Sequence, residues 1–299
     1  MLRIGVISAY AHDDWHACRI AEAAARADHV DLLLPTDFAA EVSGSRARVT
    51  VRGRDAAQWD LFLTPRALGD EGEPDVQLEL YRVLAQSGAR VCNDVDALLV
   101  AIDKFRTSWE LARAGIPTPD ARVVQTAADA HAALAALGEV VVKPIYGSLG
   151  LGVERVDDTA RLDELLAARR ALYLQRFVAG ATLDVRAFVV GERVAAAMAR
   201  RPRAGDFRGN AHQGSTARPF ALDDRAAAIA VAATRAIGLD YSGVDLLVGE
   251  RGVEVIEVNG TPSFRTIFEA TGRDMAPLVV EHATSSFHRR RASEWRRAE

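Results

Sequence analysis

The sequence predicts an α/β protein whose first part, residues 1–98, forms a small domain around a parallel sheet. Short apolar runs alternate there with stretches in which apolar residues recur at helical spacing. This alternation is typical of strands joined by crossover helices, which pair in parallel and leave a ligand crevice at their carboxyl ends. The expected strands are 2–8, 30–35, 46–53, 59–65 and 89–93.

Two further units are expected, at residues 99–175 and 176–290. The second begins with a helix that Asp103 and Lys104 open and that Gly115 and Pro117 end, followed by a buried strand at 139–144. A strand near 171–178 leads into the third, which contains strands at 182–190 and 194–201, a helix at 223–237, a strand hairpin within 243–264 and a closing helix with a structural His282. Residues 291–299 are expected to be a solvated, loosely ordered basic tail.

Composition restricts the class of protein. The formal net charge of −4 and the pI near 6 argue against a general nucleic-acid binder. No apolar run reaches the roughly 18 residues that span a bilayer, and no signal-peptide pattern is present at the N-terminus. Cys18 and Cys92 have neither metal-binding nor redox spacing, which suits a reducing compartment. We therefore expect a cytoplasmic protein without membrane or nucleic-acid partners.

The hairpin at 243–264 carries the main candidate site. Glycines at 249 and 252 supply the turn, and period-two alternation places Glu257 and Asn259 on one face of the second strand. Asp245 reaches that face from the first strand if the register is right. Two carboxylates and an amide oxygen suit magnesium or manganese. The alternative is a half-buried hairpin with a hydrated polar face.

A second candidate feature follows the strand at 139–144. Lys143 comes after three valines, and burial of its ammonium is costly unless it faces an anion. The glycine-rich segment 146–152 then offers backbone N–H groups to phosphate oxygens, although it lacks the Gly-Lys-Ser/Thr of a Walker A loop. An ordinary flexible hairpin tip is the alternative explanation of this segment.

Two polar loops remain. The first contains His12, Asp13, Asp14 and His16 next to a helix start; capping is the ordinary explanation and a metal site is the alternative. No G-x-G-x-x-G follows the first strand, which argues against a dinucleotide site there. The second loop, 205–215, is glycine-flanked and charged, a composition typical of mobile or ligand-ordered segments.

Six motifs in order resemble the ATP-grasp ligases, and most closely the RimK-type α-L-glutamate ligases. They are Lys104, VVKP with the glycine-rich segment (141–152), LQRFV (174–178), LDVR (183–186), RRPRAGDFRGNAHQGS (200–215), and GVDLL with IEVNGTP (243–262). The Arg-Gly-Asn run at 208–210 is also similar to bacterial glutathione synthetase. The resemblance extends from about residue 90 to 285.

The resemblance implies an ATP-grasp fold behind an N-terminal Rossmann-like domain, with ATP between two α+β lobes. It implies two Mg²⁺ or Mn²⁺ ions on Asp245, Glu257 and Asn259. Arg176 stands where many members have Glu, and Pro262-Ser263 replaces their Pro-Gly. The remaining implied nucleotide contacts are Lys104 and Lys143 on the phosphates, Gly147, Ser148 and Gly150 in the closing loop, Gln175, Arg176, Phe177 and Val178 at the adenine, Asp184 at the ribose, and Arg208, Gly209 and Asn210.

The implied reaction is ATP-dependent carboxylate–amine ligation through an acyl phosphate, with phosphoryl transfer aided by charge neutralisation. Arg200, with Arg208 and Asn210, is the candidate for stabilising the tetrahedral oxyanion. The expected substrates are an amino acid, L-glutamate first, and the carboxylate of a small cofactor or a protein C-terminus, received by loops 10–16, 66–74 and 204–216. A homo-oligomer is possible. The alternatives are a dipeptide or D-alanyl ligase and an inactive nucleotide-binding module.

Overall fold

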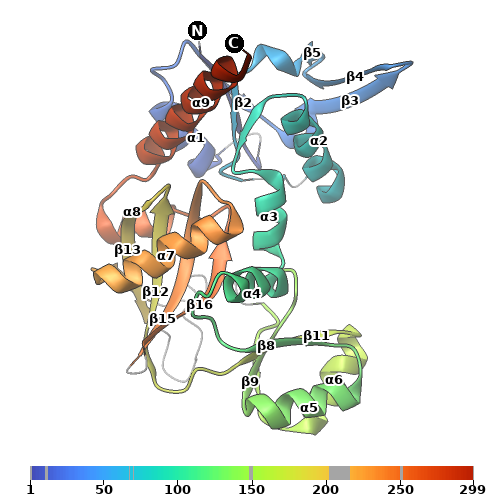
Figure 1. The fold of residues 1–299 in the computed structure, drawn as a ribbon, viewed down its shortest axis with the longest axis vertical. Helices are drawn as coiled ribbons and strands as arrows, with labels where there is room; N and C mark the ends of the chain where they lie inside the picture. Colours follow the sequence, from blue (N-terminus) through green and yellow to red (C-terminus); the bar gives the residue numbers. More distant parts are fainter. Residues whose placement is uncertain are drawn as a thin grey trace.

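The computed structural model describes residues 2–10, 13–66, 68–69, 71–147, 151–201, 216–249 and 252–298 (Figure 1). Helices and strands alternate along this part of the chain, and the strands form four sheets. The α/β class expected from the sequence is therefore confirmed. No helix in the described ranges combines the length and the apolar character that crossing a bilayer requires.

The N-terminal sheet is parallel, in the order β2-β1-β6-β7. Apolar residues at its centre, such as Ile4, Val6 and Leu63, are fully buried. Asp14 starts the first helix by accepting hydrogen bonds from the N–H groups of His16 and Ala17. The elements are β1 (Arg3–Ile7), α1 (Trp15–Ala23), β2 (His29–Leu33), β6 (Leu61–Leu63), α2 (Pro74–Gln86) and β7 (Arg90–Cys92).

The strand expected at 46–53 does not join that sheet. It is β4 (Arg46–Val51), which pairs antiparallel with β3 (Phe38–Ser43) and with the short β5 (Arg54–Asp55). This hairpin projects from the N-terminal part of the molecule (Figure 1). The expectation was wrong because only Val49 and Val51 of β4 are buried, whereas a parallel strand covered on both faces needs a continuous apolar run.

The central part holds a small antiparallel sheet in the order β10-β9-β11-β8. Its inner residues pack against two helices, which bury Ala130, Ala133, Leu162 and Leu165. The elements are α3 (Val95–Ile102), α4 (Lys104–Arg113), β8 (Ala121–Val124), α5 (Ala127–Leu137), β9 (Val140–Lys143), β10 (Glu154–Val156), α6 (Thr159–Arg169) and β11 (Leu172–Arg176).

The largest sheet is antiparallel, in the order β14-β13-β12-β15-β16, and has a distinct core on each face. Helix α7 covers one face, and helices α8 and α9 cover part of the other. The elements are β12 (Ala181–Val190), β13 (Arg193–Arg201), β14 (Thr216–Pro219), α7 (Asp224–Ile237), β15 (Tyr241–Gly249), β16 (Gly252–Asn259), α8 (Arg265–Thr271) and α9 (Ala276–Ala298).

The C-terminal residues differ from the expected loose tail. Helix α9 runs without interruption from Ala276 to Ala298, so the segment from residue 291 continues a helix that packs on α1. The chain ends therefore lie near each other beside the N-terminal sheet (Figure 1). The domain boundaries at 98, 175 and 290 stay a prediction.

Candidate active site

The hairpin of β15 and β16 brings the three expected metal ligands to one face. Asp245 pairs directly with Glu257, and Gly243 pairs with Asn259. A register shift lies between Asp245 and Leu246. The pairs Asp245–Glu257 and Gly243–Asn259 both lie on the same side of this shift, so regular alternation holds across them. The amide nitrogen of Asn259 donates to the Gly243 carbonyl at 3.2 Å, which fixes the orientation of its oxygen.

Asp245 is almost completely buried, with 2% of its surface exposed, and its charge is balanced by two arginines. Arg186 on β12 donates to both carboxylate oxygens, at 2.7 and 2.6 Å, and Arg200 on β13 lies 3.3 Å away. Burial alone would raise the pKa of Asp245, but the two guanidinium groups hold it below its ordinary value. Asp245 is therefore an anion held inside the protein by arginine.

Arg186 is not among the site residues expected from the sequence, although its position on the strand could have indicated that it belongs to the site. It lies two residues after Asp184 on the same strand, so alternation directs both side chains to the same face. The register then sets Arg186 opposite Asp245. The cross-strand pairing was the missing information.

Arg200, the expected oxyanion stabiliser, is 5% exposed and faces two carboxylates. Its Nε donates to Asp184 at 3.0 Å, and its Nη2 forms ion pairs with Asp184 and Asp245. Burial and the neighbouring Asp245 raise the pKa of Asp184, while Arg200 opposes that shift. The two acids and the arginine form one buried network beside the hairpin.

Two lysines reach the same region from different elements. Lys104, the first residue of α4, lies 3.6 Å from Glu257 and donates from Nζ to the Gly147 carbonyl at 2.5 Å. Lys143 at the end of β9 donates to Gln175 Oε1 at 2.7 Å. Burial lowers the pKa of Lys143, and the nearby Lys104 lowers it further, while Glu257 opposes the shift. An added anion would stabilise both ammonium groups.

The oxygen-bearing side chains of the hairpin are of the kind that a hard divalent cation prefers, although both oxygens of Asp245 already accept hydrogen bonds from Arg186. Cationic side chains outnumber carboxylates here, so a bound anion would be stabilised electrostatically. The cations are Arg186, Arg200, Lys104 and Lys143, and the carboxylates are Asp184, Asp245 and Glu257. No group of three or more His, Cys, Asp or Glu side chains in the described ranges could itself hold a metal ion. The two carboxylates of the hairpin therefore need the Asn259 oxygen, water or phosphate oxygens to complete a magnesium shell.

The segment expected at the adenine is partly engaged with the protein. The N–H of Arg176 donates to the Asp120 carbonyl at 2.8 Å and that of Phe177 to the Glu139 carbonyl at 2.9 Å, so neither N–H is available to a base. The Arg176 side chain forms an ion pair with Glu254 at 2.6 Å. Gln175 Nε2 is buried and lacks a hydrogen-bond partner in the described structure, a costly state without a ligand or water.

Several expected residues lie outside the described ranges. They are Ser148 and Gly150 of the glycine-rich segment and Arg208, Gly209 and Asn210 of the polar loop. His12 is also outside them, whereas Asp14 of the same first loop acts as a helix cap.

His16 connects this first loop to the turn after Asn259. Its Nε2 lies 3.1 Å from Ser263 Oγ, although the two residues are 247 positions apart in sequence. Burial, together with the positive charge of Arg66, lowers the pKa of His16 to about 4, so the ring is neutral near pH 7. The Nε of Arg66 is buried without a hydrogen-bond partner in the described chain.

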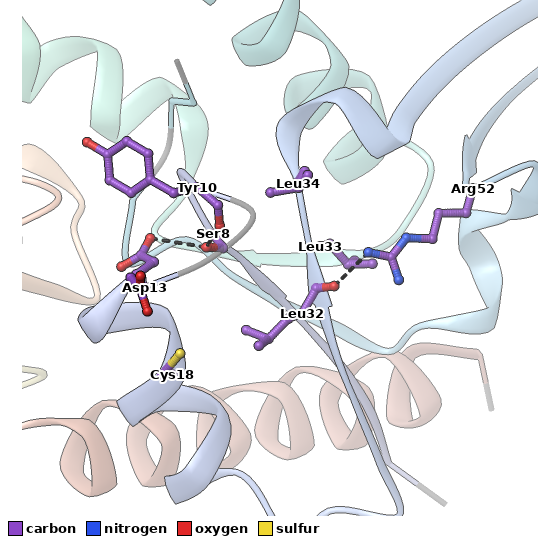
Figure 2. Close-up of a pocket in the computed structure, with 9 residues that line it drawn as sticks. Ser8, Tyr10, Asp13, Cys18, Leu32, Leu33, Leu34 and Arg52 are labelled. Carbon is purple, nitrogen blue, oxygen red and sulfur yellow. Dashed lines mark hydrogen bonds between the residues drawn. The ribbon is translucent and has the colours of Figure 1, made fainter. Parts of the chain in front are cut away.

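A cavity of about 240 Å³ opens at the carboxyl ends of β1 and β2, where ligands bind in parallel sheets (Figure 2). Arg52 lies at its side and donates to the Leu32 carbonyl at 2.8 Å (Figure 2). Its lining residues are Ser8, Tyr10, Asp13, Asp14, Cys18, Leu32, Leu33, Leu34 and Arg52.

Comparison with known proteins decides the family. Residues 101–282 match the RimK-like ATP-grasp domain. The chain belongs to the RimK-like ATP-grasp family. This membership confirms the fold and the activity class expected from the motifs, an ATP-dependent ligase that joins a carboxylate to an amine.

The relatives of this RimK-like protein include ligases with different acceptors. A tetrahydromethanopterin:α-L-glutamate ligase of Methanosarcina acetivorans is 31% identical over 69% of this chain and 74% of its own length. A ribosomal protein bS6–L-glutamate ligase of Salmonella schwarzengrund is 31% identical over 90% of this chain and 93% of its own. A probable α-L-glutamate ligase of Klebsiella pneumoniae is 32% identical over 89% and 90%, respectively.

Solved structures agree with the fold. The ATP-grasp ligase PsnB, complexed with a minimal precursor, Mg and ADP, superimposes with a TM-score of 0.73 over 95% of this chain and 98% of its own, at 19% identity. The D-alanine–D-alanine ligase of Bacillus anthracis, complexed with ATP, has a TM-score of 0.70 over 98% of this chain and 100% of its own, at 18% identity.

Proposed function

We propose that this protein uses ATP to join the amino group of L-glutamate to the carboxylate of an acceptor. The observation that carries the proposal is the meeting of Lys104 and Lys143 with the polar face of the β15–β16 hairpin, where Asp245, Glu257 and Asn259 lie. The names of relatives at 31% identity support glutamate as the amine donor.

The site suits the formation of an acyl phosphate. A carboxylate oxygen attacks the γ-phosphorus of ATP and ADP leaves; the glutamate nitrogen then attacks the acyl carbon, phosphate leaves, and the nitrogen loses a proton. Lys104 and Lys143 offset the repulsion between the triphosphate and the incoming carboxylate. Arg200 is proposed to stabilise the tetrahedral oxyanion together with Arg208 and Asn210. For this role, one N–H group of the Arg200 guanidinium must donate to the substrate while Arg200 remains paired with Asp184 and Asp245.

We propose that two magnesium or manganese ions are held by Asp245, Glu257 and Asn259 when nucleotide is bound. Held there, the ions would supply positive charge that offsets the negative charge of the phosphate groups during phosphoryl transfer. The PsnB complex with Mg and ADP supports a metal-bound nucleotide in this fold. We further propose that the remaining expected nucleotide contacts, at Gly147, Ser148, Gly150, Gln175 to Val178, Asp184 and 208–210, serve this nucleotide. Within 175–178 the contacts are proposed to use groups other than the N–H of Arg176 and of Phe177, which already donate to backbone carbonyls.

The acceptor is proposed to approach from the N-terminal loops. His16 and Ser263 connect the loop after β1 to the turn after Asn259, and Arg66 lies close enough to influence the His16 ring. Arg265 acts on the same ring, so two cationic side chains lie near His16 and suit an acceptor that carries a carboxylate. A small cofactor with a carboxylate and a protein C-terminus both meet that description.

The metal assignment is tested with Glu257→Gln. Loss of one carboxylate beside Lys104 should abolish magnesium-dependent ADP release and leave the far-ultraviolet circular dichroism spectrum unchanged. Glu41→Gln, at an exposed carboxylate on β3, is the matched control and should retain activity. Normal turnover by the Glu257 variant would remove the metal assignment.

The amine donor is tested by a screen of amino acids and carboxylate acceptors for ADP production, with mass spectrometry of the products. ADP production should rise when glutamate and a suitable acceptor are both present. Stimulation by D-alanine and not by glutamate would replace the proposal with the dipeptide-ligase alternative, which the fold of the D-alanine–D-alanine ligase also fits.

A further inference from the structure

One buried side chain ties the N-terminal sheet to both strands of the hairpin. Asn93 follows β7 and is fully buried. Its Nδ2 donates to the Tyr241 carbonyl at 2.9 Å and to the Gly260 carbonyl at 2.6 Å. Its Oδ1 accepts from the N–H groups of Asp240 and Tyr241 at 2.7 and 3.1 Å. All four hydrogen bonds of this amide group are therefore used.

The partners of Asn93 lie immediately beside the proposed metal ligands. Tyr241 is the first residue of β15 and precedes Asp245 by four positions, while Gly260 directly follows Asn259. Asn259 in turn donates to the carbonyl of Gly243 near the start of β15. Asn93 thus holds the beginning of one strand and the end of the other in a fixed relation.

The turn after Asn259 is also closely packed by neighbouring residues. A Cβ atom on Gly260 would lie 2.7 Å from Leu98 Cδ2 on α3, and one on Gly243 would lie 2.9 Å from Pro262 Cβ. The backbone of the turn is therefore pressed between α3 and β15. Its register relative to β15 is set by this packing together with the bonds to Asn93.

We propose that Asn93 is a positioning residue that places the Asn259 oxygen for the metal ion of the nucleotide complex. Magnesium demands near-ideal octahedral geometry at about 2.0–2.1 Å, so a small shift of the Asn259 backbone weakens binding. This inference rests on the metal site of the proposed function. It adds that the N-terminal domain, through one amide, sets the metal affinity.

The test compares Asn93→Asp with Tyr241→Phe. An aspartate at position 93 keeps both acceptor contacts but turns an oxygen toward the Tyr241 and Gly260 carbonyls, so it breaks the hold on Gly260. Tyr241→Phe removes only the hydrogen bond from Tyr241 Oη to the Thr64 carbonyl, 3.0 Å long, which also joins β15 to the N-terminal part. It is the matched control for a general loss of domain contact. Asn93→Ser, a milder change, replaces Asn93→Asp if the latter does not fold.

Mn²⁺ binding is measured by electron paramagnetic resonance in the presence of a non-hydrolysable ATP analogue, and nucleotide binding is measured separately without metal. The Asn93 variant should bind Mn²⁺ about tenfold more weakly, the lower end of effects from residues that orient metal ligands. Its metal-free nucleotide affinity and the Mn²⁺ affinity of Tyr241→Phe should match the unaltered protein.

Two results would overturn the inference in different ways. If the unaltered protein binds Mn²⁺ with the nucleotide and the Asn93 variant binds it equally well, Asn93 has only a structural role, and the proposed function stands. If the unaltered protein shows no metal binding with the nucleotide, the metal site itself is wrong, and this inference is lost with it.

Discussion

Removing Arg186 should expose how much stability depends on the buried charge of Asp245. The change is Arg186→Met, which keeps most of the side-chain volume but deletes the two hydrogen bonds at 2.7 and 2.6 Å. Loss of one partner from a buried ion pair costs about 3–5 kcal/mol. Arg200 remains 3.3 Å from Asp245, so we expect the lower value. About 3 kcal/mol corresponds to a fall in Tm of about 5 °C for a chain of this size.

The pH dependence of the effect follows from the pKa of Asp245. In the unaltered protein that pKa is depressed, so its stabilising contribution is present above the ordinary carboxyl pKa of about 3.9 and is lost as pH falls through the folded-state value. Without Arg186, burial raises the pKa, and Asp245 becomes neutral at a higher pH. The deficit of the variant should therefore be largest near pH 7 and shrink on acidification.

The measurement is thermal unfolding followed by circular dichroism at several pH values. Arg113→Met is the control, because Arg113 is an exposed arginine in an (i, i+3) pair. A second variant, Arg186→Met with Asp245→Asn, removes the buried charge and should be more stable than Arg186→Met alone. The reasoning is refuted if Arg186→Met unfolds no earlier than the control, or if its deficit does not change with pH.

Three further outcomes are expected. Lys143→Met should raise the KM for ATP about tenfold, since a hydrogen bond to a charged group is worth about 1.5–3 kcal/mol, and an unchanged KM in ATP titrations would count against phosphate contact. Arg176→Ala should lower the free energy of unfolding measured by urea titration by no more than about 1 kcal/mol, and Glu254→Ala should not add to it, because both belong to one partly exposed ion pair. His16 should titrate near pH 4 by NMR. Because this lies below the ordinary 6.5, stability should decline as pH falls from 6.5 to 4, and His16→Gln should remove that decline.

Local pattern predicted the elements of this fold well. The alternation within 2–98 gave the parallel strands, and the helix that begins at Lys104 and the hairpin that carries Asp245 and Glu257 were both expected. These features depend on the period of apolar residues, on caps and on turn residues, all of which act over a few positions. The six motifs added the family, which the comparison with the RimK-like ATP-grasp domain confirmed.

Assignments that depend on partners far apart in sequence were missed. The strand at 46–51 was placed in the wrong sheet, because a short alternating run fits either kind of pairing until its neighbours are known. Arg186 was overlooked because its partner Asp245 lies 59 positions away in sequence, on the strand beside it in the sheet. Nothing in the local sequence around Asn93 indicates its contacts with residues 147 to 167 positions away.

The chemical groups of this site can be read from the amino-acid sequence: lysines at the starts and ends of elements, oxygen ligands on one hairpin, and a glycine-rich segment after Lys143. Their electrostatic state follows only from the folded chain, which sets Asp245 between two arginines and both lysines near Glu257. The difference arises from the distance along the chain over which each effect acts. Propensity and periodicity act within a few residues, whereas burial and charge pairing depend on which distant strands become neighbours.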